Sequence, residues 1–143
     1  MSMSLYLVKV TPTIGERMQA DPELLLQVWG AVDPVEPDIA DLDEDEDKLL
    51  EDYLGISHIL LDKPDRYPWL ARALHGTGEV VDFEYGYGPG FIVRADMAAQ
   101  IVAGLAEEGW WRQGDEVVTV DHAIAAFYAA AADQGRTVIG GIG

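Results

Sequence analysis

Asp62 and Lys63, together with the glycine-rich segment at residues 86–90, have the residue types best suited to a binding site. A carboxylate and an ammonium held near the backbone N–H groups of a turn can bind a polar ligand. The opposing interpretation is that Asp62 caps the segment that follows it and that Lys63 is solvated. We treat the following residues as a candidate face for a ligand or partner, with no catalytic residue assigned: Asp62, Lys63, Trp69, Gly86, Tyr87, Gly88 and Pro89.

The glycine-rich segment does not fit a nucleotide-binding loop. Gly86, Gly88 and Gly90 lead into a strand-forming run that begins at Phe91, whereas a dinucleotide-binding loop opens a helix. The Gly-Lys-Ser/Thr of a Walker loop is absent. Backbone conformations with positive φ, which glycine adopts readily, remain as the reason for these glycines. We therefore predict a fixed turn at this point of the chain.

Nucleophilic catalysis is also disfavoured by the residue types. The segment from Gly55 to Ile59 has Ser57 at its centre, as in a nucleophile elbow, but Ile59 stands where that tight turn needs a glycine. Ser57 and His58 are sequence neighbours, which does not make their side chains face each other. The chain has no cysteine, which excludes disulfides, thiolate zinc sites and cysteine nucleophiles.

Asp41, Asp43 and Asp45 are spaced like the start of a calcium-binding loop. However, Glu46 occupies the position at which that loop requires glycine, and Asp52 is short for the bidentate glutamate that closes it. The histidines are not spaced like zinc ligands. We expect weak adventitious cation binding at most, no dedicated metal site and no cofactor.

The net charge is −17, and eleven of the 26 acidic side chains lie between Asp33 and Asp52. Such a field repels nucleic acid and anionic membranes, so neither is an expected partner. It would favour a basic protein surface, although acidity also serves solubility alone. The candidate acidic partner surface consists of Asp41, Asp43, Glu44, Asp45, Glu46 and Asp47.

The length of 143 residues suits a single domain with a core of its own. The first apolar run has no basic region before it and is interrupted by Lys9, so we expect no signal peptide. The small-residue run at 123–132 is shorter than the roughly 20 residues that span a bilayer. We expect a cytoplasmic protein.

Helical and strand patterns alternate irregularly along the chain, which predicts an α+β fold with a mostly antiparallel or mixed small sheet and helices packed on it. Thr13 and Glu16 have capping-box spacing, and Asp121 is a suitable N-cap. The acids at 43–47 are expected to form the first turn of a helix that ends near Gly55, and the C-terminal glycines are expected to fray. Strands are predicted at 5–10, 81–85, 91–93 and 137–139, with weak extended structure at 117–120; helices are predicted at 14–20, 24–29, 43–54, 69–74, 95–108 and 122–134.

Three short motifs resemble the YfbM-like family, a bacterial domain of unknown function. They are the Met-Ser-Met-Ser-Leu-Tyr-Leu start, Leu61-Asp62-Lys63 with the helix that ends at Gly76, and Gly86-Tyr87-Gly88-Pro89 with the following strand and helix. Phe127-Tyr128 in the alanine-rich segment adds to the likeness. Two segments, at 64–68 and 110–121, depart from the family pattern. The resemblance implies a single α+β fold and brings no known activity.

Three functions follow as hypotheses from these observations. The first is a non-catalytic module that binds a protein or a small polar ligand through the candidate face. The second is an immunity-type inhibitor whose acidic segment covers the basic surface of a toxin or nuclease. The third is a small enzyme of unrecognised type. Added salt would weaken electrostatic capture steeply and would hardly affect binding at the turn.

Overall fold

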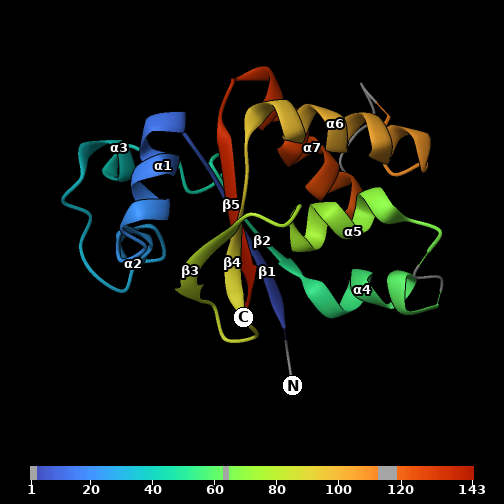
Figure 1. Cartoon of the computed structure of the whole chain (residues 1–143), viewed down its shortest axis with the longest axis horizontal. Coiled ribbons are helices and arrows are strands. Elements are labelled where there is room, and N and C mark those ends of the chain that lie inside the picture. Colours follow the sequence, from blue (N-terminus) through green and yellow to red (C-terminus); the bar gives the residue numbers. More distant parts are fainter. Residues whose placement is uncertain (1–2, 63–64, 113–118) are drawn as a thin grey trace.

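The fold is α+β, built on a five-stranded antiparallel sheet (Figure 1), as predicted. A computed structural model describes residues 3–62, 65–112 and 119–143, and only the backbone of residues 61 and 62. The strand order is β2-β1-β5-β4-β3. The strands are β1 (Ser4–Val10), β2 (Lys48–Asp52), β3 (Val80–Glu84), β4 (Pro89–Val93) and β5 (Thr137–Ile142).

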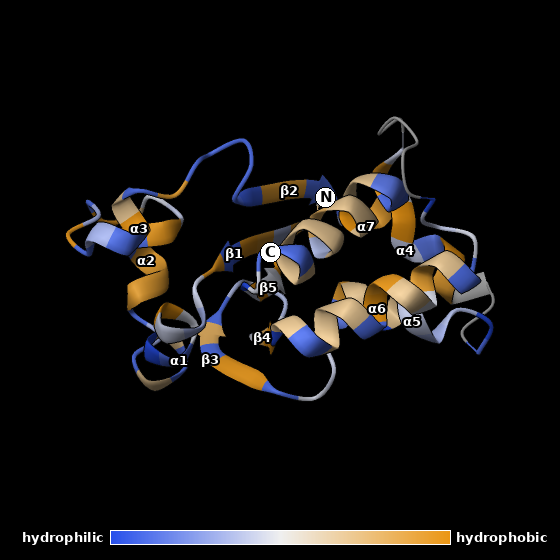
Figure 2. Cartoon of the chain, turned by 90° about the horizontal axis from the view of Figure 1, so that it is seen from above, coloured by the Kyte–Doolittle hydropathy of each residue, from blue (hydrophilic) through white to orange (hydrophobic). Residues whose placement is uncertain are grey.

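Helices cover both faces of the sheet (Figures 1 and 2). One face carries the short helices α1 (Pro12–Ala20), α2 (Leu24–Val28) and α3 (Pro37–Ala40). The other face carries α4 (Tyr53–Asp62), α5 (Pro68–His75), α6 (Ala95–Glu107) and α7 (Val120–Asp133). Among the described residues, none of these helices combines the length and the apolar character that crossing a bilayer would need.

Each face of the sheet has its own hydrophobic core. Side chains of a strand alternate between the two faces, so Leu5 and Leu7 of β1 pack toward α4–α7 whereas Val8 and Val10 pack toward α1–α3. This alternation places Lys9, which follows Leu5 and Leu7 at the same spacing, on the face covered by α7.

The prediction that the acidic run begins a helix is wrong. Residues 43–47 form a turn, and residues 48–52 form the edge strand β2, which pairs antiparallel with β1. Leu49 packs against the core and Leu50 is 59% exposed, which is the alternation of a strand with one wet face. The helix begins only at Tyr53, so Gly55 lies inside α4 and does not end a helix.

The C-terminal glycines do not fray, contrary to the prediction. Gly140 and Gly141 belong to β5, which lies between β1 and β4 at the centre of the sheet. A Cβ on Gly140 would lie 2.5 Å from the Leu7 side chain, and one on Gly141 would lie 2.1 Å from the Tyr85 ring. Glycine is therefore needed here for close packing, not for a turn.

Two threonines cap helices where other residues were predicted to do so. The N-cap of α1 is Thr11, whose hydroxyl accepts from the N–H of Ile14, and Pro12 occupies the first turn. The N-cap of α7 is Thr119, not Asp121. Residues 117 and 118 of the predicted extended connector lie outside the described residues, and Val120 begins the helix.

Candidate functional site

The predicted glycine turn is confirmed for Gly86 to Gly88, between β3 and β4, but Pro89 and Gly90 already belong to β4. Gly90 has no positive φ, and a Cβ there would lie 2.8 Å from the Tyr85 ring. Gly86 and Gly88 have φ values of 124° and 121°, in the region that favours glycine. Both of their N–H groups donate to Oε1 of Glu84, at 2.9 Å each. The N–H of Tyr87 donates to the carbonyl of Ile142 at 3.0 Å. The turn is therefore fastened to its own hairpin and to the end of β5.

A small hollow lies beside this turn. It has a volume of about 180 Å³ and is lined by His75, Tyr87, Gly88, Pro89, Phe91, Gly141 and Ile142. Tyr87 is 49% exposed. Gly76, with φ of 84°, allows α5 to end against Phe91, because a Cβ there would lie 2.5 Å from the Phe91 side chain.

His75 is held in this hollow by Tyr53. The hydroxyl of Tyr53, at the start of α4, lies 2.5 Å from Nε2 of His75, at the end of α5. Burial lowers the pKa of His75 and raises the pKa of Tyr53. At neutral pH the phenol therefore keeps its proton and the imidazole is uncharged. We assign the Tyr53 hydroxyl as donor to Nε2, which places the proton of the His75 ring on Nδ1.

We call His75, Tyr87, Gly88 and Pro89, with Tyr53 behind His75, the hairpin face. Tyr87, Gly88 and Pro89 were predicted as site residues and line its hollow, and Gly86 lies in the same turn. Tyr53 and His75 were missed, because the 22 positions between them leave no local signal in the sequence. Gly76, which follows His75, was predicted from the sequence only as the end of a helix.

The structure places Trp69 away from the hairpin face. Its ring packs on α6, where a Cβ at Gly104 would lie 2.0 Å from it, and the guanidinium of Arg72 lies 4.3 Å from the ring centroid. Its backbone N–H donates to the carboxylate of Glu108 at 2.9 Å. Trp69 thus belongs to the contact between α5 and α6, with a cation–π interaction on its outer side.

The structure does not join the predicted Asp62–Lys63 pair to the turn. Lys63 lies outside the described residues, as does the side chain of Asp62. The backbone of Asp62 ends α4, nine residues from Tyr53 and so roughly 14 Å along the helix from the hairpin face. Figure 1 shows this end of α4 on the far right, well separated from the loop between β3 and β4.

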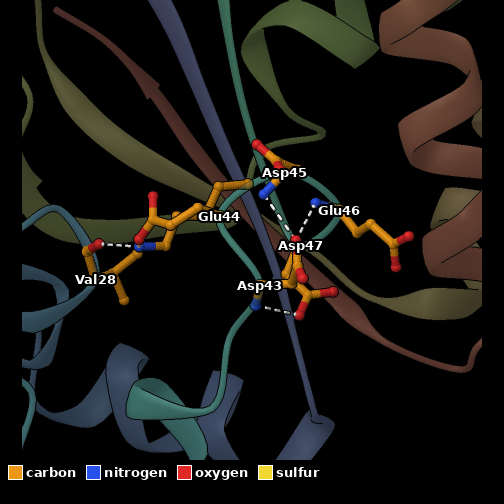
Figure 3. Close-up of polar contacts among 7 residues, drawn as sticks. Val28, Asp43, Glu44, Asp45, Glu46 and Asp47 are labelled. Atoms are coloured by element: carbon orange, nitrogen blue, oxygen red, sulfur yellow. Dashed lines mark hydrogen bonds and ion pairs between the residues drawn. The ribbon is translucent and has the colours of Figure 1, made fainter.

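The acidic residues 43–47 form a turn held by its own carboxylates (Figure 3). Oδ1 of Asp43 accepts from the N–H groups of Asp45 and Glu46, at 2.8 and 2.9 Å, and these bonds lower the pKa of Asp43. Oδ2 of Asp47 accepts from the N–H of Asp43 at 2.8 Å. Two of the five acids, Asp43 and Asp47, therefore use their carboxylates to stabilise the turn.

The acidic partner surface is smaller than the sequence suggests. The side chain of Asp47 is only 14% exposed and accepts from Nη1 of Arg136 at 2.8 Å. Glu44 pairs with Lys48 at 2.5 Å, and Nζ of Lys48 also donates to the carbonyl of Val28. Asp41, Asp43, Glu44, Asp45 and Glu46 remain exposed, so Asp47 is the one predicted acid that the fold withdraws from this surface. In the part of the chain that the structure describes, no three acidic or histidine side chains are grouped to hold a metal ion.

No protein-family model matches the chain, and neither a curated protein nor a solved structure is similar to it. The resemblance to the YfbM-like family therefore remains a prediction from its motifs.

Proposed function

We propose that this protein is a non-catalytic binding module that holds a segment of a partner protein against the hairpin face. The observation that carries this proposal is the exposed Tyr87 on a turn held by four hydrogen bonds. Two run from backbone N–H groups to the Glu84 carboxylate and two run between backbone groups, the second of these from the N–H of Tyr85 to the carbonyl of Gly88. An aromatic side chain with few rotatable bonds, carried on a backbone that is already fixed, loses little conformational entropy on binding, which makes it an effective anchor.

The size and chemistry of the hollow favour a peptide side chain as its occupant. Its volume of about 180 Å³ lies below the range of about 300–1,000 Å³ usual for metabolite pockets. Nδ1–H of His75 suits a backbone carbonyl or a carboxylate of the incoming segment. The residues that line the hollow carry no carboxylate, thiol or aliphatic hydroxyl, so His75 has no nucleophile there to activate.

A random peptide library displayed against the purified protein tests this proposal. We expect the selected peptides to converge on a shared motif, and we expect Tyr87→Ala to weaken the best peptide by at least about tenfold, as for a typical anchor residue. Val35→Ala is the matched control, because Val35 is 81% exposed and lies in the loop before α3, on the other side of the sheet. Equal affinity of wild type and Tyr87→Ala would refute binding at this face.

The acidic turn supports a second candidate, the immunity-type inhibitor of a basic toxin or nuclease. Its own hydrogen bonds fix the turn while Asp45 and Glu46 stay exposed, so the charges are arranged before a partner arrives. Such an inhibitor would lose affinity for its target by at least about tenfold between low and high salt, and Asp45→Asn would weaken it. Binding at the hairpin face would change little under both tests.

A further inference from the structure

Lys9 lies in the interior although it is charged. Its side chain is 3% exposed, on the face of β1 that packs toward α7. Its Nζ lies 5.7 Å from the centroid of the Phe127 ring, a cation–π contact. Burial lowers the pKa of Lys9, the charge of Arg136 lowers it further, and Asp47 and Glu46 act in the opposite direction.

The ammonium of Lys9 meets no hydrogen-bond acceptor among the described residues. Both oxygens of the nearby Asp47 carboxylate already accept one hydrogen bond, Oδ1 from Arg136 and Oδ2 from the N–H of Asp43. The ammonium has three N–H donors, and Nζ of Lys9 is not among the fully buried atoms that lack a partner, so it reaches the opening of the hollow that Lys9 lines. Its donors are therefore open to an acceptor from outside the protein, water or a ligand.

Lys9 lines an open depression in the surface, with a volume of about 440 Å³. We call it the Lys9 cavity. One wall is apolar and comes from α7 and β2, with Ala123, Phe127 and Leu49. The acidic turn supplies two exposed carboxylates to the lining, Asp45 and Glu46. Figure 3 shows the side chain of Glu46 pointing outward from the turn, away from the hydrogen bonds that build it.

These groups select among ligand classes. A simple anion would satisfy Lys9 but would be repelled by Asp45, Glu46 and the net charge of −17. A simple cation would pair with the carboxylates and would be repelled by Lys9 and by Lys48, which also lines the cavity. An apolar molecule would fill the wall and leave the ammonium without an acceptor. A molecule with an acidic head, a short aliphatic body and a cationic end meets all three requirements.

We propose that the Lys9 cavity binds a small zwitterion of the amino-carboxylate class, with its carboxylate on the ammonium of Lys9 and its amino group toward Asp45 and Glu46. This site lies apart from the hairpin face and does not depend on the function proposed there.

Calorimetric titration of the whole protein with a ladder of ω-amino acids tests the proposal. The probes are glycine, β-alanine, γ-aminobutyrate and ε-aminocaproate, with butyrate and butylamine as controls that carry one charge each. We expect at least one amino acid to bind at roughly millimolar concentration or below and at least tenfold more tightly than either control. Absence of binding by the whole ladder, or equal binding of butyrate or butylamine, would overturn the proposal.

Substitutions test whether the amino acid binds in the Lys9 cavity. Lys9→Met and Glu46→Gln should each weaken the best amino acid by at least about tenfold, while Asp38→Asn, which removes an exposed charge of the same sign in α3, should leave it unchanged. Ala123→Leu adds bulk to the wall without touching a charge, so it tests the site even where Lys9→Met fails to fold. Binding that survives Lys9→Met in the folded state, or that survives Ala123→Leu, would refute this location.

Discussion

At the scale of single residues, burial lowers the pKa of two basic side chains, Lys9 and His75. Lys9 follows the core residues Leu5 and Leu7 on the same face of β1, where an apolar side chain would be the default. His75 contacts the hydroxyl of Tyr53 and lies beside Phe91 of β4. Groups that a fold retains at a cost in stability are concentrated at sites of function.

Replacing Lys9 by methionine should stabilise the protein. Methionine has a similar volume and removes a charge that burial disfavours, so we expect the free energy of unfolding in urea to rise by about 1–2 kcal/mol. Lys48→Met is the matched control, because Lys48 donates to the carbonyl of Val28 and to Glu44, and its loss should lower stability. A destabilised Lys9→Met would show that the contacts with Phe127 and Asp47 outweigh the cost of burial.

His75 should make the fold less stable in mild acid. Its pKa is lowered in the folded state from the ordinary 6.5, so in the window below 6.5 the unfolded chain binds more protons and stability rises with pH. Acidification therefore removes stability until the lowered pKa is passed. We expect the fall in melting temperature between about pH 7 and pH 5 to be smaller in His75→Gln than in wild type. His58→Gln, the same substitution at an exposed position of α4, is the control variant.

At the scale of elements, glycines serve two different purposes in neighbouring parts of the sheet. Gly88 in the hairpin turn has φ of 121° and open space around its Cα, so a side chain there meets backbone strain alone. Gly141 in β5 is in extended conformation, and a side chain there meets the ring of Tyr85. The same substitution at the two positions therefore costs free energy for unrelated reasons.

Gly88→Ala and Gly141→Ala should each destabilise the fold by about 1–3 kcal/mol, measured by urea denaturation. Truncation of the neighbouring ring separates the two causes. In a double-mutant cycle, Tyr85→Ala should relieve part of the loss caused by Gly141→Ala and none of the loss caused by Gly88→Ala. Equal coupling of Tyr85 to both glycines would contradict this division.

At the scale of the whole molecule, the sequence predicted the elements with local signals and missed those that depend on distant partners. The class of fold, β1, the hairpin turn and the helices after Pro68 and Ala95 were predicted from periodicity, proline and glycine. β2 was missed because Leu49 and Leu50 fit a helical stripe as well as a strand, and only pairing with β1 decides between them.

The same limit applies to the candidate site. Tyr87, Gly88 and Pro89 were predicted because the turn has an unmistakable composition. The pairing of Tyr53 with His75, and the cavity around Lys9, exist only through tertiary packing of α4 on α5 and of α7 on β1. The apolar residues at 5–10 are typical of an interior strand, with Lys9 as the exception, but they do not show what surrounds its ammonium.

The placement of β5 has a consequence for how this chain assembles. It follows every other strand in the sequence and yet lies between β1 and β4. Before it arrives, the remaining strands are two separate ribbons, β2 with β1 and β4 with β3, neither of which is stable alone. Val138 and Ile139 then enter opposite cores at once. We therefore expect both hydrophobic cores to form in one late, cooperative step, when β5 pairs with β1 and β4.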